Sequence, residues 1–202
     1  MKHILITAFE PFGGESINPS LEVIKTLPAS IPGALLHTLE LPVSRYAATD
    51  LLLSVVAELQ PQVVILLGEA GGNTEITPER VAINVEDYPI PDHAGHQPLD
   101  EPIIENGPAA YFSTLPIQEI VTNLRALGLP AQISNSAGTY LCNRTFYSLM
   151  HFLETTGAST SAGFVHVPYL PEQTVNKPPH TPSLPLADLS SGILELLRTT
   201  VA

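Results

Sequence analysis

Residues 62–67 (QVVILL) constrain the fold more than any other part of the sequence. The run is almost entirely apolar and rich in β-branched residues, and it ends at Gly68, a pattern typical of a central parallel strand covered on both faces. Parallel strands need crossover connections, which are usually helices. Residues 44–60 supply one, because their apolar side chains recur at helical spacing. The chain therefore favours an α/β fold.

The rest of the chain continues this alternation. Strands are predicted at residues 3–8, 35–43, 131–134 and 163–167, and helices at 19–27, 115–127, 142–155 and 186–199. The pattern predicts a three-layer α/β/α sandwich around a largely parallel, twisted sheet. Residues 69–111 form a long excursion rich in Gly and Pro, in which only 81–85 has a strand pattern. We expect residues 1–202 to form a single domain, because the Pro-rich stretch 168–185 leaves a tail too short to fold alone.

Composition excludes several classes of function. Eight Lys and Arg against 20 Asp and Glu give a net charge of −12, so nucleic acid and acidic membranes are not expected partners. The single cysteine cannot form an internal disulfide or a cysteine-based zinc site, which favours a reducing compartment. The first apolar run is broken at Pro11 and Gly13, and no segment has the length of a membrane helix. A cytoplasmic protein is therefore expected.

The residues that follow the predicted strands are the place to look for chemistry, because ligands in open α/β sheets bind beyond the carboxyl ends of the strands. Four strand ends carry unusual residues: FEPFGG at 9–14, GEAGG at 68–72, the segment 135–141 before Cys142, and His166 within GFVHV. We expect these four to share one crevice.

Cys142 stands at the start of a predicted helix, where unpaired backbone N–H groups and the positive end of the helix dipole favour a thiolate. A thiolate beside an imidazole is a nucleophile at neutral pH. Taken alone, a single cysteine is more often a small buried hydrophobic residue.

His166 and Glu79 are the candidate partners of Cys142. His166 points to one face of its strand while the flanking valines point to the other, although an isolated histidine of this kind is more often structural. Glu79 precedes Arg80, and their spacing favours a surface ion pair. The other six histidines have no evident partner or metal-ligand spacing. Spacing alone cannot bring Glu79 to His166.

Two other functions are compatible with these residues. A non-catalytic binder could seat an anion where Gly13 and Gly14 precede the helix capped by Asn18, although this loop has no P-loop lysine. The chain could also be a scaffold that oligomerises through an apolar surface. Neither would hydrolyse a peptide.

Seven separated motifs resemble, in order, those of the type I pyroglutamyl peptidases, also called pyrrolidone-carboxylate peptidases. They are FEPFGG (9–14), INPS (17–20), GEAGG (68–72), ITPERVAIN (76–84), GPAAYFSTLPI (107–117), SAGTYLCN (136–143) and HVPYLPEQ (166–173). An ordered set that covers nearly the whole chain is far more specific than any one motif.

The resemblance implies a cysteine exopeptidase that removes an N-terminal pyroglutamyl residue, with Cys142 as nucleophile, His166 as base and Glu79 as the carboxylate that orients the base. The family is similar to phosphorylase/hydrolase-like sandwiches, commonly forms tetramers and uses no metal or organic cofactor. The expected substrates are peptides that begin with pyroglutamate. The residues expected to form the substrate pocket are Phe9, Phe12, Glu69, Tyr140 and Leu141.

Some positions depart from the pattern of the relatives. Glu69 stands where relatives often have Gln, Asn73 and Pro89 where they often have Arg, and Tyr140 where Phe is common. A carboxylate at Glu69 beside the sulfur would disfavour the thiolate. The Tyr140 hydroxyl would need a hydrogen-bond partner. These departures bear on rate and substrate preference and leave the triad intact.

Overall fold

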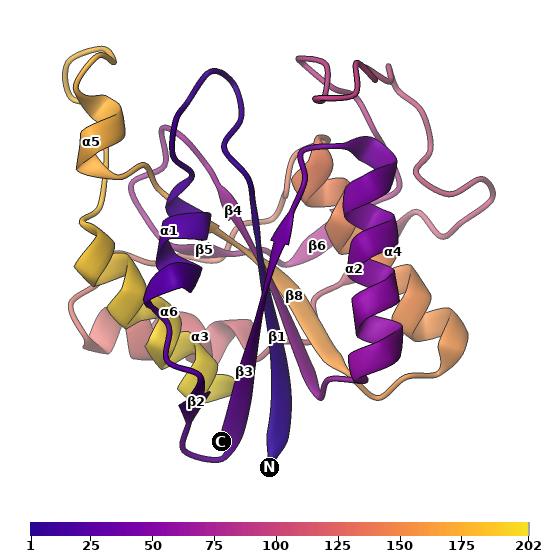
Figure 1. Cartoon of the computed structure of the whole chain (residues 1–202), viewed down its shortest axis with the longest axis horizontal. Coiled ribbons are helices and arrows are strands. Elements are labelled where there is room, and N and C mark those ends of the chain that lie inside the picture. Colours follow the sequence, from indigo (N-terminus) through magenta and orange to yellow (C-terminus); the bar gives the residue numbers. More distant parts are fainter. Residues whose placement is uncertain (202) are drawn as a thin grey trace.

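A six-stranded sheet forms the middle layer of the structure, a computed structural model that describes residues 1–201. Four parallel strands make its centre, in the order β3 (Ala34–Leu41), β1 (Lys2–Phe9), β4 (Val63–Glu69) and β8 (Ser161–Val167). Two short strands, β2 (Ser30–Ile31) and β5 (Thr77–Pro78), pair antiparallel at the margins. Helices cover both faces, so the predicted three-layer fold is confirmed (Figure 1).

The helices divide between the two faces of this sheet. One face is covered by α1 (Pro19–Thr26), α3 (Ile117–Ala126) and α6 (Leu186–Val201), and the other by α2 (Arg45–Leu59) and α4 (Leu141–Thr156) (Figure 1). The one-turn helix α5 (Pro171–Thr174) follows β8, and β6 (Val81–Ile83) pairs with β7 (Ala110–Phe112) in a separate two-stranded antiparallel sheet. Within residues 1–201, no helix combines the length and apolarity needed to cross a membrane.

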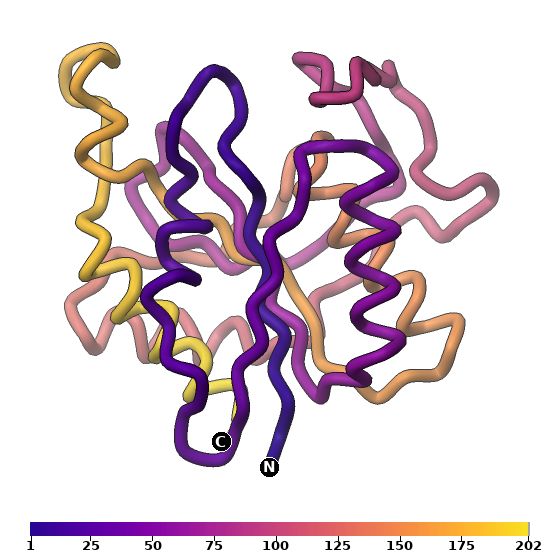
Figure 2. The backbone as a smooth tube through the Cα atoms, viewed as in Figure 1, coloured from indigo at the N-terminus to yellow at the C-terminus, as the bar shows by residue number. Residues whose placement is uncertain are grey.

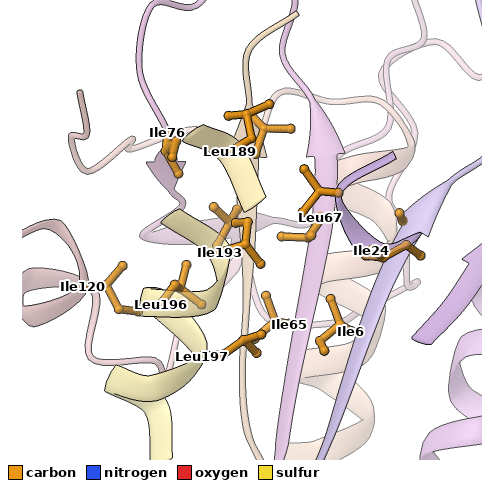
Figure 3. Close-up of a cluster of buried hydrophobic side chains, with 14 of the residues drawn as sticks. Ile6, Ile24, Ile65, Leu67, Ile76, Ile120, Leu189, Ile193, Leu196 and Leu197 are labelled. Atoms are coloured by element: carbon orange, nitrogen blue, oxygen red, sulfur yellow. The ribbon is translucent and has the colours of Figure 1, made fainter. Parts of the chain in front are cut away.

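Each face of the sheet carries its own hydrophobic core, because successive side chains of a strand point to opposite sides. Leu189 and Ile193 of α6 pack in one core with Leu67 of β4 (Figure 3). Val64 and Leu66 of the same strand face the other way, towards the core beneath α2 and α4. Each fully buried aliphatic side chain contributes about 1.5–3 kcal/mol, so the two cores together hold the strand ends in place.

The loop after β1 is turned back over the sheet by a capped helix. Asn18 Oδ1 accepts a hydrogen bond from the backbone N–H of Ser20 at 3.0 Å, and Pro19 occupies the first helical position. An N-cap of this kind satisfies backbone donors that the helix leaves unpaired. The cap predicted from the sequence is therefore confirmed, and it fixes where the loop after β1 ends.

Several short elements differ from the sequence prediction. The pattern predicts a strand at residues 131–134, but they make only isolated bridges, from Ala131 to Ile76 and from Ser134 to Glu79. The Pro-rich stretch 168–185, for which the sequence predicts no helix or strand, contains α5. Elements of two to four residues carry too little periodicity to be recognised, because their pairing is decided by tertiary contacts.

The excursion predicted after β4 is present. Figure 2 shows the chain between β6 and β7 extending from the sheet at the upper right. Its start is fastened to the segment that precedes Cys142, since the backbone N–H of Asp87 donates to the carbonyl oxygen of Thr139 at 3.1 Å. The hydroxyl of Thr139 donates in return to the carbonyl oxygen of Asp87 at 2.8 Å.

Candidate active site

His166 lies near the carboxyl end of β8, on the face that α4 covers. Its strand neighbour Gly68 belongs to β4, and the His166 ring packs against Phe164, with 4.7 Å between ring centroids. Val165 and Val167 point to the opposite core, as the alternation of the strand requires. His166 is 7% exposed, so it is buried but close to the surface.

Glu79 reaches His166 from the margin of the sheet. Thr77 of β5 pairs with His166, and the backbone N–H of Glu79 donates to the carbonyl oxygen of Phe164 at 2.8 Å. This pairing brings Glu79 Oε1 to 2.7 Å from His166 Nδ1. Glu79 is only 1% exposed, and its Oε2 has no hydrogen-bond partner among the atoms of residues 1–201. The carboxylate is therefore committed to the histidine and not to Arg80.

The charge state of His166 follows from its surroundings. Burial acts to lower the pKa of the imidazole, but the negative charge of the Cys142 thiolate, hydrogen bonding with it and the Glu79 carboxylate outweigh burial. Together they raise the pKa of His166 to about 10. With Nδ1 held by Glu79, Nε2 is the ring nitrogen left to exchange a proton with the sulfur.

Cys142 is the second residue of α4, as the sequence predicts for a nucleophile at a helix start. Tyr140 caps the helix without a side-chain hydrogen bond, and the first N–H bonded back to the cap is that of Arg144, 3.0 Å from the Tyr140 carbonyl oxygen. The backbone N–H groups of Leu141 and Cys142 precede this bond. They are positioned to stabilise negative charge in front of the helix.

Asn143 fixes the start of α4 to the β6 segment. Its Oδ1 accepts a hydrogen bond from the backbone N–H of Ile83 at 2.9 Å, and its Nδ2 donates to the carbonyl oxygens of Ile83 and Val85, each at 2.9 Å. The side chain is fully buried. It satisfies three backbone groups that would otherwise lack partners, so the direction of the helix start is well determined.

Gly68 provides the space in which the sulfur sits. A Cβ atom at this position would lie 2.7 Å from Cζ of Phe164 and 3.1 Å from Sγ of Cys142. Both distances are shorter than normal packing allows, so a side chain here would displace the ring or the nucleophile. The close approach also places the end of β4 directly against the Cys142 side chain.

The pocket residues predicted from the sequence differ in exposure. Phe12 and Tyr140 are half-buried and lie close together, with ring centroids 6.5 Å apart. The Tyr140 hydroxyl finds a partner in the carbonyl oxygen of Pro91 at 3.4 Å. Phe9 is 4% exposed and Leu141 is 2% exposed. Leu141 could therefore contact a ligand only through its backbone.

Glu69 follows Gly68, so its side chain points to the opposite face of the sheet from Cys142. Its Oε2 accepts a hydrogen bond from Nε2 of Gln173 at 2.8 Å. Burial raises the pKa of the Glu69 carboxyl, against the effect of this hydrogen bond. The arrangement separates the Glu69 charge from the sulfur. The effect on the thiolate that the sequence suggests is therefore weakened.

Three polar residues near the site are not predicted from the sequence. Glu86, Tyr88 and Arg144 form a buried hydrogen-bonded cluster behind Tyr140. The available signal is weak, because charged residues are usually exposed, both in a loop, as for Glu86, and on a helix, as for Arg144.

Asn73 and Pro89, where relatives often carry Arg, are both exposed. Within residues 1–201, no group of three His, Cys, Asp or Glu side chains could hold a metal ion.

A sequence model of the pyroglutamyl peptidases matches residues 2–199. The chain belongs to the pyroglutamyl peptidase family. Pyroglutamyl peptidases are cysteine-type hydrolases that remove N-terminal pyroglutamyl residues. The three residues that meet at the sheet edge, Cys142, His166 and Glu79, lie within the motifs that carry the resemblance.

Several relatives match this chain over nearly its full length. The pyrrolidone-carboxylate peptidase of Vibrio vulnificus strain YJ016 is 50% identical over 201 residues, which are 99% of this chain and 92% of the relative. The solved pyrrolidone carboxyl peptidase of Thermococcus litoralis is 44% identical, with a TM-score of 0.97 over 100% of this chain and 94% of that chain. Pyroglutamyl peptidase I of Bacillus amyloliquefaciens is 40% identical, with a TM-score of 0.95 over 100% and 95%.

Proposed function

We propose that Cys142, His166 and Glu79 hydrolyse the bond that follows an N-terminal pyroglutamyl residue of a peptide. The observation that carries this proposal is the buried contact of 2.7 Å between Glu79 Oε1 and His166 Nδ1, beside the Cys142 sulfur. Nucleophile, base and orienting carboxylate in one hydrogen-bonded series are the arrangement that cysteine and serine hydrolases use. Membership of the family supplies the substrate class.

The reaction begins with attack of the Cys142 thiolate on the carbonyl carbon of the pyroglutamyl residue. The carbonyl oxygen becomes negatively charged, and the backbone N–H groups of Leu141 and Cys142 are the proposed donors to it. His166, protonated at neutral pH because its pKa is raised to about 10, donates its proton to the leaving amine. The carbon–nitrogen bond breaks, and a thioester with Cys142 remains.

Water completes the cycle. Neutral His166 removes a proton from a water molecule, whose oxygen attacks the thioester carbonyl, and the Cys142 thiolate leaves. The products are free pyroglutamate and the shortened peptide, and His166 carries its proton again. Throughout, Glu79 accepts the hydrogen bond from Nδ1, which keeps Nε2 directed at the reacting atoms.

The proposed acyl pocket suits a neutral five-membered lactam. A pyroglutamyl group has no free amine, so apolar walls with a few backbone hydrogen bonds bind it better than a buried carboxylate would. Phe12 and Tyr140 supply neighbouring aromatic walls. Glu69, which the sequence suggests for this pocket, would contribute only through its backbone, because its carboxyl is held by Gln173.

Hydrolysis of a fluorogenic pyroglutamyl amide tests the proposal. Cys142→Ala and His166→Ala are expected to lose several orders of magnitude in kcat/KM, and iodoacetamide to inactivate the wild type. His151→Ala is the matched control, because His151 bonds to the Tyr111 hydroxyl at 2.9 Å, in contact with neither Cys142 nor Glu79. Full activity in Cys142→Ala would remove the cysteine from the mechanism, and a twofold effect of His166→Ala would mean that another base exists.

We also propose that the protein is a cytoplasmic homo-oligomer, a tetramer by family resemblance. A single free cysteine is suited to a reducing compartment. Exposed apolar side chains at Leu99 (79%), Val175 (77%) and Phe112 (67%) offer surface for association. Light scattering after size exclusion measures the mass directly, and a mass of 21.6 kDa across micromolar concentrations would contradict the proposal.

A further inference from the structure

A buried polar cluster stands behind the aromatic wall of the acyl pocket. Glu86 is fully buried, and its Oε2 accepts hydrogen bonds from Nη1 of Arg144 at 2.6 Å and from Nε of Arg45 at 2.9 Å. Its Oε1 accepts a hydrogen bond from the Tyr88 hydroxyl at 2.6 Å. A buried carboxylate held by two guanidinium groups is a fixed anchor, because leaving any of these charges unpaired would be costly.

Tyr88 connects this anchor to the pocket. Its ring meets the ring of Tyr140 edge to face, with 4.6 Å between centroids and 69° between the planes. Tyr140 in turn lies next to Phe12. Tyr88 is only 3% exposed, so a ligand in the pocket would touch Tyr140 and not Tyr88. Any effect of Tyr88 on binding must therefore pass through the position of the Tyr140 ring.

The anchor and the wall are also joined along the backbone. The backbone N–H of Tyr88 donates to the carbonyl oxygen of Pro98 at 2.9 Å. Asp87, which precedes Tyr88, is hydrogen-bonded to Thr139, which precedes Tyr140. Burial and the Glu86 charge raise the pKa of the Tyr88 phenol. The hydroxyl therefore stays protonated at neutral pH and keeps its role as a donor to Glu86.

We infer that Tyr88 is a positioning residue that sets the width of the acyl pocket by holding the Tyr140 ring towards Phe12. The inference rests on the proposed function, because it assumes that Phe12 and Tyr140 enclose the lactam ring. A pocket of fixed width distinguishes rings by size, and one methylene in an apolar pocket changes kcat/KM by about 10- to 200-fold. Tyr88 thus favours a five-membered over a six-membered lactam.

The test compares two substrates in three variants. The substrates are the aminomethylcoumarin amides of 5-oxoproline and of its six-membered homologue, 6-oxopiperidine-2-carboxylic acid, and the readout is the ratio of their kcat/KM values. Tyr88→Ala, which leaves space behind Tyr140, is expected to lower the ratio at least about tenfold, and Tyr88→Phe, which removes only the tether to Glu86, about threefold. Tyr147→Phe should leave the ratio unchanged.

Tyr147→Phe is a matched control because it also removes one buried phenol hydroxyl. That hydroxyl donates to the carbonyl oxygen of Pro108 at 2.7 Å, and Tyr147 is fully buried. The Tyr147 ring packs against Tyr111 and His151, not against Tyr140. A loss of stability alone would affect both phenylalanine variants, whereas a change of ring selectivity is expected only at Tyr88.

Binding of the free lactams separates this inference from the proposed function. The relative affinity of 2-pyrrolidone and 2-piperidone, measured by NMR titration, reports the pocket width without turnover. If the wild type hydrolyses neither amide but prefers 2-pyrrolidone, and Tyr88→Phe reduces that preference, the proposed function fails and the inference stands. If both Tyr88 variants keep the wild-type ratios, the inference is wrong. If Tyr88→Ala fails to fold, the ratios measured for Tyr88→Phe alone decide whether the inference holds.

Discussion

Glu79 and His166 are 87 residues apart in the chain, and their side chains meet at 2.7 Å because β5 pairs antiparallel with β8. The contact is almost entirely shielded from solvent, since Glu79 is 1% exposed and His166 is 7% exposed. Because the contact is shielded from water, the Glu79 carboxylate acts on the His166 imidazole alone. Its removal should therefore be felt mainly at the imidazole.

Glu79→Gln keeps the shape of the side chain and removes its charge. We expect kcat/KM for a pyroglutamyl amide to fall by about 10²- to 10⁴-fold, because the amide can hold Nδ1 in the wrong tautomer and no longer stabilises the imidazolium. The loss should be smaller than that of Cys142→Ala. Steady-state kinetics measure both. A Glu79→Gln variant with wild-type activity would show that His166 needs no carboxylate.

The His166 imidazole should stay protonated far above neutral pH. Its pKa, raised to about 10, depends on the thiolate charge, so Cys142→Ala should lower it. Because the folded protein binds this proton more tightly than the unfolded chain, the resulting stability is present below about pH 6.5 and is lost as pH rises through 10. NMR titration of the ring measures the shift, and an equal pKa in both proteins would contradict the thiolate as its cause.

Gly68→Ala should damage the site by crowding it. The added Cβ would approach Phe164 and the Cys142 sulfur to 2.7 and 3.1 Å. We expect a stability loss of about 1–3 kcal/mol and at least a tenfold loss of kcat, because the nucleophile is displaced. Gly192→Ala on α6 is the control, since its Cβ would approach Ile76 to 2.8 Å without touching the sulfur. Equal kcat losses in both variants would exclude a local effect.

Asn143→Ala should loosen the start of α4. Removing its fully buried side chain leaves backbone groups of the half-buried Ile83 and Val85 without these hydrogen-bond partners. We expect a loss of at least about 2 kcal/mol in the free energy of unfolding. Asn123→Ala, which removes an amide that donates to the Thr199 hydroxyl at 3.0 Å, should cost about 1 kcal/mol. Urea denaturation measures both, and similar values would argue against the special role of Asn143.

The central strands and long helices could be predicted from the sequence because their periodicity is strong. The apolar run of β4 and the capped start of α1 are examples, and both appear where the pattern indicates. The position of Cys142 at a helix start was predictable for the same reason. These features depend on local sequence, so they can be recognised in a single chain.

The contacts between distant segments could not be predicted in this way. Spacing alone makes Glu79 a surface partner of Arg80, and only the pairing of β5 with β8 turns it towards His166. The orientation of Glu69 away from the sulfur depends on the register of β4, and the burial of Glu86 depends on two arginines supplied by different helices. Such contacts arise from tertiary structure, which resemblance to a family can suggest but periodicity cannot.

The three members of the proposed triad stand on supports of unequal strength. Cys142 belongs to a 16-residue helix and His166 to a seven-residue strand with neighbours on both sides, whereas Glu79 follows a two-residue strand at the margin. Short marginal segments open at lower free energy than central ones. On heating, the carboxylate should detach while sulfur and imidazole still face each other, so that thermal inactivation begins as a local fraying that precedes the melting of the fold.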